Sequence, residues 1–476
     1  MAKPGALCRI LDDAAGTVAE DGGAAHTADA LRAAASSLAA QLRAEGLTPD
    51  EPVIVAVANR AADLASFFGV WQAGGVAVPL HAGAAEMTRT TILEQTGARN
   101  LVANGTVARL AEVPPPARPL LDGAALIVFT SGSTGKPKGV VLAHDRFAGK
   151  LDALQELLAL TPSDKVVLPL QLIFIFGLWV ALLSLKTGAR LELVGKFTPA
   201  GLKARLPDAT VLATVPSMLR TLFGEGEVAA PQLRAILTGG EGLGTHLAGA
   251  IATQLPGAGV FDLYGLTETG SCDFCLRPAD AETGRGSIGR PTPGIDYLIS
   301  DDPAAGATGA GPDAAGELLI RTPFGMIGYL DNPDLTQAAF RDGFFRTGDV
   351  ARRRPDGCVE IVGRIKEIVS RGGNKIAPAE IETVLCAHPA VAQALAAGVP
   401  DPRLGEALHA AVVLRAGSSA SADELRAWCA ARIERFKVPD AIHVVAALPT
   451  GPTGKAYRPG IRALADAAVP TATQGR

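Results

Sequence analysis

The sequence predicts an α/β fold, with a large N-terminal domain of layered α/β subdomains, a β-rich subdomain and a small α+β C-terminal domain. Short apolar runs alternate with helical patterns in the first half of the chain, and strand-like segments follow a loop rich in Gly, Ala, Pro and Asp. The pattern changes again near residue 377. A chain of 476 residues is also too long for one compact core, so more than one folding unit is expected.

Helical and strand-like segments follow one another in the N-terminal part. Residues 27–44 and 61–72 carry apolar side chains at helical spacing, whereas residues 53–57 and 76–79 are short β-rich runs. Further strand candidates are residues 210–215, 235–237 and 260–263. Such alternation is typical of layered folds with mainly parallel strands.

One stretch, residues 166–185, carries no charge and is long enough to be considered as a membrane span. Pro169, Gln171 and Gly177 interrupt it, and no second stretch of this kind follows. We therefore expect a buried strand, a turn and a core helix here, and no stable membrane insertion.

The second half of the chain predicts a β-rich segment and then a small α+β unit. The loop is residues 301–316, and the strands after it are residues 316–323 and 357–364. The α+β unit should contain a helix (378–388), two strands (391–399 and 408–415) and a second helix (422–436). A boundary near residues 364–367 separates an N-terminal domain of residues 1–365 from a C-terminal domain of residues 366–476.

Composition and charge exclude some functions. The chain has 44 Lys and Arg against 48 Asp and Glu, a net charge of −4, and its basic residues are scattered, so we do not expect nucleic-acid binding as its main task. No secretory signal is visible, and six sparse cysteines fit a reducing cytoplasm. Cys272 and Cys275 form one C-x-x-C without a second pair at zinc-ligand spacing, which favours ordinary thiols.

The strongest local signal is a β-type run that enters a loop rich in Gly, hydroxyl side chains and Lys. Glycines let backbone N–H groups approach phosphate oxygens, hydroxyls donate further hydrogen bonds, and lysine neutralises charge. The spacing differs from a Walker A loop because Pro137 follows Lys136. The predicted phosphate-binding residues are Thr130, Ser131, Gly132, Ser133, Thr134, Gly135 and Lys138.

This run, SGSTGKPKG, resembles the phosphate loop of the superfamily of acyl- and aryl-CoA synthetases, peptide-synthetase adenylation domains and luciferases (the ANL superfamily of adenylate-forming enzymes). Four more segments resemble motifs of the same superfamily, in the same order along the chain. They are YGLTETG (264–270), FRTGDV (345–350), GRIKEIVSRGGNKIAPAEIE (363–382) and LPTGPTGKAYR (448–458). The resemblance covers nearly the whole chain and implies ATP, Mg²⁺ and coenzyme A as cofactors or co-substrates.

The resemblance implies roles for individual residues. Glu268, beside Thr267, would hold the Mg²⁺ that bridges the ATP phosphates, although an acid at a helix N-terminus is the plainer alternative. Asp349 would accept hydrogen bonds from the ribose hydroxyls, and Arg364 would add a ribose or phosphate contact; an ordinary turn aspartate and a surface ion pair are the alternatives. The turn Gly239, Gly240 and Glu241 and the segment Asp262, Tyr264 and Gly265 would enclose the adenine, with Gly residues that leave room for the acyl chain.

In the resembling family the C-terminal domain is mobile. Lys455 would bridge the substrate carboxylate and the α-phosphate as negative charge develops, which is worth roughly 10²–10³ in rate. The domain would then rotate about a hinge at Lys366 and present the segment with Arg371, Gly372, Gly373 and Lys375 to the pantetheine of CoA. No side-chain nucleophile is required, and no convincing Ser-His-Asp or Cys-His set is present.

The expected reaction is ATP-dependent activation of a carboxylic acid to an acyl-AMP, followed by thioester formation with coenzyme A. A stand-alone enzyme that transfers the acyl group to a carrier protein or another nucleophile is the alternative. Most relatives have a His about where Phe174 stands in this chain. Its replacement by aromatic residues before a Gly-Leu resembles the benzoate-CoA ligase group. A pocket with Phe174 and Phe176, and with Gly240 and Gly265, would suit an aromatic, alicyclic or medium apolar acid, although these rings could equally be core packing.

Overall fold

The computed structural model of the protein describes residues 5–130, 137–300, 314–450 and 456–468. Internal contacts divide the chain into two compact units. The N-terminal unit comprises Met1–Leu298, Leu319–Arg346 and Arg354–Val359, and the C-terminal unit comprises Ile299–Leu318, Thr347–Arg353 and Glu360–Arg476.

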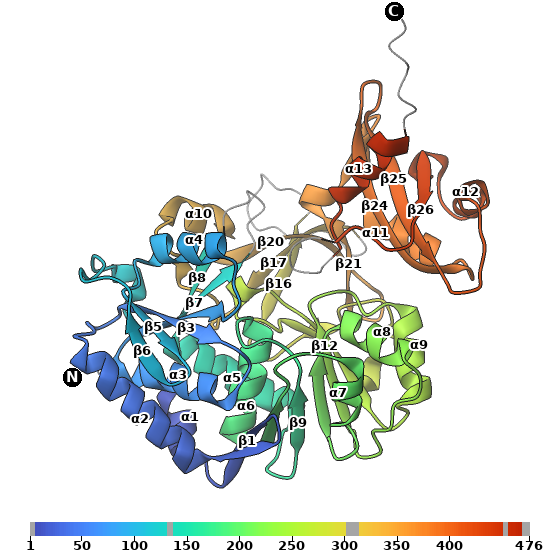
Figure 1. Ribbon diagram of the computed structural model, residues 1–476. Helices are drawn as coiled ribbons and strands as arrows, with labels where there is room; N and C mark the ends of the chain where they lie inside the picture. The colour runs from blue at the N-terminus through green and yellow to red at the C-terminus, as the bar shows by residue number, and fades with distance from the viewer. Residues whose placement is uncertain (1–4, 131–136, 301–313, 451–455, 469–476) are drawn as a thin grey trace, which may run out of the picture. The chain divides into compact units, whose positions relative to one another are not determined.

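The first sheet of the N-terminal unit has nine strands in the order β15-β14-β13-β12-β11-β9-β10-β1-β2. Its strands β1, β9 and β12 are labelled in Figure 1. Its middle is parallel from β1 to β13, and antiparallel strands lie at both edges. The strands are β1 (Thr17–Asp21), β2 (Ala24–Thr27), β9 (Lys165–Leu168), β10 (Arg190–Leu193), β11 (Val211–Thr214), β12 (Ala235–Gly239), β13 (Gly259–Tyr264), β14 (Phe274–Leu276) and β15 (Arg290–Pro291).

The second sheet has seven strands in the order β18-β8-β7-β4-β3-β5-β6. Strands β7, β4, β3 and β5 are parallel, whereas β8, β18 and β6 are antiparallel to their neighbours. The strands are β3 (Pro52–Val57), β4 (Val76–His81), β5 (Asn100–Ala103), β6 (Thr106–Arg109), β7 (Ala124–Thr130), β8 (Lys138–Ala143) and β18 (Gly328–Tyr329). The two sheets confirm the predicted α/β class.

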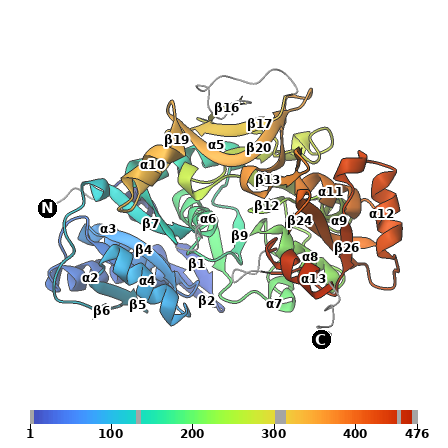
Figure 2. The same ribbon diagram turned by 90° about the horizontal axis from the view of Figure 1, so that it is seen from above.

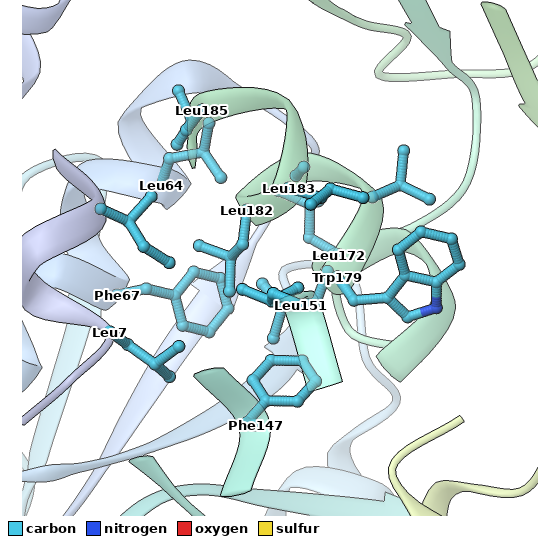
Figure 3. Close-up of a cluster of buried hydrophobic side chains, with 14 of the residues drawn as sticks. Leu7, Leu64, Phe67, Phe147, Leu151, Leu172, Trp179, Leu182, Leu183 and Leu185 are labelled. Atoms are coloured by element: carbon cyan, nitrogen blue, oxygen red, sulfur yellow. The ribbon is translucent and has the colours of Figure 1, made fainter. Parts of the chain in front are cut away.

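The core of this unit joins both sheets through helices. Side chains of β3 and β9 belong to the same buried cluster as side chains of α3 (Ala61–Ala73), α5 (His144–Leu158) and α6 (Ile175–Thr187). Figure 3 shows Leu64 and Phe67 of α3 beside Phe147 and Leu151 of α5 and the leucines of α6. Each fully buried leucine contributes roughly 2 kcal/mol to folding. The remaining helices of the unit are α1 (Cys8–Asp13), α2 (Ala28–Ala44), α4 (Glu86–Thr96), α7 (Pro199–Lys203), α8 (Pro216–Gly224), α9 (Thr245–Gln254) and α10 (Pro333–Ala339), with short 3₁₀ turns at Pro119–Leu121 and Pro278–Asp280.

The apolar stretch 166–185 forms the predicted strand, turn and core helix. Strand β9 ends at Leu168, before Pro169, and α6 begins at Ile175. Ten of the thirteen residues of α6 are buried, so the helix is covered on nearly all sides, which explains why its sequence is apolar all round. No helix among the described residues is both long enough and apolar enough to cross a membrane.

A smaller sheet confirms the β-rich segment. Its order is β16-β17-β20-β19, with β21 paired to β20, and Figure 2 shows β16, β17 and β20 side by side. The strands are β16 (Asp296–Ser300), β17 (Gly316–Arg321), β19 (Phe340–Arg341), β20 (Phe344–Arg353) and β21 (Val359–Arg364). Most of the predicted loop at 301–316 lies outside the described residues.

The C-terminal unit contains a sheet in the order β23-β22-β25-β24, with β26 paired to β25. One face packs on α11 and α12 through Ile381, Leu385, Leu425 and Cys429, and the other face packs on α13 through Ile461 and Ala465. The elements are β22 (Val369–Arg371), β23 (Asn374–Ile376), α11 (Pro378–Cys386), β24 (Val391–Asp401), β25 (Gly405–Leu414), α12 (Ala422–Ala430), β26 (Ala441–Val444) and α13 (Gly460–Ala468), with 3₁₀ turns at Ile365–Glu367 and Arg435–Lys437.

One prediction of detail is wrong in this unit. The second helix was predicted over residues 422–436, but α12 ends at Ala430, and Ile433 packs against the core from the following turn. The segment SRGGNK forms the β22–β23 hairpin. Gly372 and Gly373 form its two-residue turn with φ of +55° and +85°, which is the geometry of a type I′ turn.

Candidate functional site

The ends of the predicted phosphate loop meet across two antiparallel strands. Thr130 is the last residue of β7 and lies opposite Lys138, the first residue of β8. Ser131, Gly132, Ser133, Thr134 and Gly135 lie outside the described residues. The Lys138 ammonium group lies 5.4 Å from the ring centroid of Tyr329, which β18 holds beside β8.

The predicted magnesium ligand lies at the same tyrosine. Glu268 is in the 3₁₀ turn η2 (Thr267–Thr269), with Thr267 half-buried beside it. The Tyr329 hydroxyl donates to Glu268 Oε1 at 3.0 Å, and the backbone N–H of Met326 donates to the Glu268 carbonyl oxygen at 2.8 Å. Burial and the neighbouring Glu268 charge raise the pKa of Tyr329, so the phenol stays a hydrogen-bond donor. Folding therefore brings Lys138 and Glu268 to one tyrosine.

The donor set fits a magnesium–nucleotide complex. Among the described residues, no group of three or more His, Cys, Asp or Glu side chains could enclose a metal ion. Mg²⁺ is commonly held by one or two carboxylates, with substrate phosphates and waters completing the shell. A cavity of about 290 Å³, which Glu268, Thr269 and Arg146 help to line, adjoins this carboxylate and is large enough for several water molecules.

The predicted adenine-binding residues lie at the carboxyl ends of β12 and β13, which are parallel and in register. The Glu241 carboxylate is engaged at the start of α8, where it accepts from the Ser217 N–H at 2.7 Å and pairs with Arg220 at 3.2 Å. Tyr264 packs edge-on to Phe274, with ring centroids 6.1 Å apart. Burial raises the pKa of Asp262 to about 7, and no donor of the described residues hydrogen-bonds its carboxyl group.

Two glycines of this region are required by backbone packing. A Cβ atom on Gly239 would lie 2.3 Å from the Leu263 carbonyl oxygen, and one on Gly265 would lie 2.2 Å from the Cys272 nitrogen. Such contacts are shorter than any normal packing distance. Backbone packing is therefore a second reason for glycine at Gly239 and Gly265, besides the room that they are expected to leave for an acyl chain. Gly240, with φ +84°, has only the Val215 side chain near its Cβ position, at 3.9 Å.

The predicted ribose-binding pair lies within the C-terminal unit. Asp349, on β20, has a side chain that is 3% exposed, and Arg364 Nε lies 2.8 Å from its Oδ1. The Asp349 backbone N–H donates to the Thr347 hydroxyl, which in turn donates to the Leu318 carbonyl oxygen. The hydrogen bonds to Thr347 fix the backbone of Asp349, and Arg364 fixes the orientation of its carboxylate.

The predicted hinge and CoA segment lie in the same unit. Lys366 is exposed, in the 3₁₀ turn η4 (Ile365–Glu367). Arg371 donates to the Phe436 carbonyl oxygen and pairs with Asp440, so its guanidinium group is already held within the unit. Lys375 donates to the Ser370 hydroxyl at 3.1 Å.

The predicted lysine loop is closed at its base. Lys455 lies outside the described residues, but Thr450 and Ala456 on either side form a β-bridge, and the Tyr457 N–H donates to the Pro449 carbonyl oxygen at 2.8 Å. Arg458 then pairs with Glu367 and Glu382.

The aromatic residues predicted for the acid pocket differ in exposure. Phe174, the residue before α6, is 52% exposed, whereas Phe176 is half-buried and stacks on Trp179 with ring centroids 5.4 Å apart. Trp179 is fully buried and belongs to the core, at the edge of the cluster in Figure 3. Packing therefore accounts for Trp179 and partly for Phe176, and leaves Phe174 available.

Sequence reasoning missed three residues of this site. Tyr329 lies 61 residues from its partner Glu268, and Lys150 and Asp273 form a buried pair behind the η2 turn. No local motif marks any of them. The one signal that this lysine is buried is its place on the apolar face of α5, where Phe147 and Leu154 stand at i−3 and i+4.

Family comparisons identify both parts of the chain. The model of the AMP-binding enzyme family matches residues 11–330, and the model of the AMP-binding enzyme C-terminal domain matches residues 380–455. A feruloyl-CoA synthase from Amycolatopsis sp is 32% identical over 94% of this chain and 95% of its own length. A fatty acid–[acyl-carrier-protein] ligase from Streptomyces coeruleorubidus is 30% identical over 92% of this chain and 91% of its own.

Other relatives match over a shorter range. A probable CoA ligase from Humulus lupulus is 34% identical over 70% of this chain, and the match spans 65% of that relative. Among solved structures, the o-succinylbenzoate-CoA synthetase of Bacillus subtilis in complex with its acyl-adenylate intermediate superposes with a TM-score of 0.84, at 26% identity, over 97% of this chain and 98% of that one. With both of its family domains matched in order, the chain belongs to the AMP-binding enzyme family, within the ANL superfamily of adenylate-forming enzymes.

Proposed function

We propose that the protein is an AMP-forming acid–thiol ligase. It activates a carboxylic acid with ATP and Mg²⁺ and transfers the acyl group to coenzyme A. The observation that carries this proposal is the convergence of Lys138, from the end of the phosphate loop, and the Glu268 carboxylate on the Tyr329 ring and hydroxyl. A cation and a carboxylate at one place suit a nucleotide triphosphate whose charge is shared between lysine and a bound Mg²⁺.

In the first half-reaction a substrate carboxylate oxygen attacks the α-phosphorus of ATP. The new bond gives acyl-AMP, and the bond to the bridging oxygen breaks to release pyrophosphate. Thr130 to Gly135 and Lys138 would contact the phosphates, and Glu268, with Thr267, would hold a Mg²⁺ that supplies positive charge to neutralise them. Lys455 contacts the carboxylate and the α-phosphate, so that catalysis is positioning and charge neutralisation.

The proposed nucleoside contacts come from residues of both units, each described within its own unit. The half-buried Asp262 has a carboxyl group without a donor among its described neighbours, which suits the exocyclic amino group of adenine, with Tyr264, Gly240 and Gly265 along the ring. Asp349, which Arg364 orients at 2.8 Å, accepts from the ribose hydroxyls. The Glu241 side chain stays bound to Ser217 and Arg220 at the start of α8, while its backbone belongs to the turn beside the adenine.

In the second half-reaction the CoA sulfur attacks the acyl carbon of acyl-AMP, and AMP leaves with the bonding electrons. We propose that residues 366–476 form the mobile domain, with Lys366 as its hinge, and that the β22–β23 hairpin contacts the pantetheine. The left-handed turn at Gly372 and Gly373 exposes backbone without side chains, and Lys375 on the following strand is exposed.

The acid is proposed to be aromatic, alicyclic or a medium apolar acid. The 52% exposure of Phe174 provides an aromatic surface, and the feruloyl-CoA synthase similarity over 94% of the chain supports an aryl acid. To test both the class of acid and the use of CoA, the purified protein is incubated with ATP, Mg²⁺ and a panel of acids, with and without CoA, and the products are identified by mass spectrometry. Acyl-CoA that forms only with CoA is the expected result.

A second candidate function is acyl transfer to a carrier protein. The similarity to a fatty acid–[acyl-carrier-protein] ligase over 92% of the chain favours it as the alternative. Acyl-AMP that accumulates without ever reaching CoA, but is discharged by a phosphopantetheinylated carrier protein, would replace the first proposal by this one.

A further inference from the structure

A charged pair is completely buried behind the turn that carries Glu268. Lys150 of α5 and Asp273 of the segment after the turn both have fully buried side chains. The Lys150 ammonium group donates to the Cys272 carbonyl oxygen at 2.7 Å, lies 3.8 Å from Asp273 Oδ1 and faces the Phe324 ring at 5.5 Å from its centroid. A buried pair of this kind is often no more stabilising than apolar residues of the same size, so its presence calls for a specific reason.

The pair is connected directly to the turn. The Thr269 hydroxyl donates to Asp273 Oδ2, and Thr269 is the residue next to Glu268. The Asp273 N–H donates back to the Tyr264 carbonyl oxygen at 2.7 Å, before the turn begins. Asp273 therefore holds both ends of the segment in which Glu268 lies.

The backbone between Thr269 and Asp273 is strained. Ser271 and Cys272 have φ of +70° and +53°, a region that residues with a side chain rarely adopt. Lys150 holds the Cys272 carbonyl oxygen, and the Thr292 hydroxyl donates to the same oxygen at 2.8 Å. Such strain persists only where surrounding contacts over-determine the conformation, and it concentrates at functional sites.

We propose that Lys150 and Asp273 are positioning residues for Glu268, which fix the η2 turn so that the carboxylate is preorganised for the magnesium–ATP complex. The inference rests on the proposed role of Glu268 in that function. Because both side chains are fully buried, neither is expected to touch the metal or the nucleotide. Their effect passes through Thr269 and the Cys272 carbonyl group to the backbone of Glu268, which the Met326 N–H holds from the other side at 2.8 Å.

The test is calorimetric titration of the full-length protein with ATP, at a series of Mg²⁺ concentrations and in EDTA. This measurement needs no knowledge of the acid. We expect Asp273→Asn and Lys150→Met to reduce the gain in ATP affinity that Mg²⁺ provides by about tenfold, with little change in EDTA, because a mispositioned carboxylate loses metal-dependent binding. High Mg²⁺ should restore much of the affinity.

Asp164→Asn is the matched control. Asp164 is also a buried aspartate with a charged partner, Arg234 at 2.8 Å, but it lies at the start of β9. It should lower the melting temperature without changing the Mg²⁺ dependence. If Asp273→Asn does not fold, Thr269→Val removes the link to the turn and leaves the buried pair intact, and it should give the same loss of Mg²⁺ dependence.

Glu268→Gln separates the two levels of the proposal. If Glu268→Gln leaves the Mg²⁺ dependence of ATP binding unchanged, the proposed role of Glu268 fails. If Glu268→Gln abolishes it but Asp273→Asn, Lys150→Met and Thr269→Val behave like Asp164→Asn, the positioning role is overturned while the proposed function stands.

Discussion

At the scale of single residues, Asp262 links the nucleotide site to pH. Burial raises the pKa of this carboxyl group to about 7 in the ligand-free protein, so it is partly protonated near neutrality. If the adenine amino group donates to it, binding favours the carboxylate and lowers its pKa. Affinity should therefore rise with pH through 7, by about fivefold between pH 6 and 8 if the pKa falls by one unit on binding and by about tenfold if it falls by two or more.

Adenosine is the appropriate ligand for this measurement, because it has no phosphate that titrates in this range. Its dissociation constant, measured at pH 6, 7 and 8, should decrease for the wild type and stay constant for Asp262→Asn, whose amide oxygen accepts at every pH. A pH-independent wild type, or an equal slope in both proteins, would remove Asp262 from the adenine contact.

At the scale of elements, a histidine pair links β25 and β26. His409 Nδ1 lies 3.2 Å from His443 Nε2, so one ring donates and the other accepts. Burial lowers the pKa of both rings, the charge of His443 lowers the pKa of His409 further, and Asp440 opposes this. Asp440 is already engaged by Arg371 and by the Leu408 N–H. The α13 side chains that pack on this face are the apolar Ile461, Leu464 and Ala465.

The sign of the pH effect follows from the lowered pKa values. A histidine whose pKa is lowered by folding stabilises the protein above its unfolded pKa, near 6.5, and this contribution is lost as the pH falls through the folded pKa. We expect amide exchange in residues 405–414 to accelerate as the pH falls from 7 to 5, after correction for intrinsic exchange. His443→Gln should weaken this acceleration. His388→Gln, outside the pair, should retain it, and identical behaviour of the two variants would contradict the assignment.

Elements are also the scale at which the sequence was most informative. Periodicity and β-rich runs predicted α2, α3, β3 and α6 closely, because each depends on local pattern and burial. The Gly-Gly pair at 372–373 is a local pattern typical of a β-hairpin turn, so the β22–β23 hairpin could have been predicted from the sequence. The contacts of Glu268 with Tyr329 and of Arg458 with Glu382 join residues 61 and 76 positions apart. No local pattern specifies such pairs, since only the completed sheets bring them together.

At the scale of the whole molecule, the proposed mechanism divides two half-reactions between two sets of residues. Lys455 serves only the step in which charge develops on the α-phosphate, whereas the hairpin with Gly372 and Gly373 serves only the thiol. Lys455→Ala should therefore lower the rate of acyl-AMP formation by roughly 10²–10³, because a preorganised cation is lost. Transfer from synthetic acyl-AMP to CoA should proceed at nearly the wild-type rate.

The reciprocal variant makes this division of labour testable. Gly373→Val places a β-branched residue where φ is +85°, in the turn of the hairpin, and should slow thioester formation while acyl-AMP formation continues. Both half-reactions are measured for both variants by quenched-flow mass spectrometry, with the acid found active in the panel. Two variants that each impair one step, and different steps, support separate catalytic arrangements of one mobile domain. If Lys455→Ala impairs both steps equally, one fixed arrangement serves the whole reaction, and the hinge at Lys366 has no catalytic role.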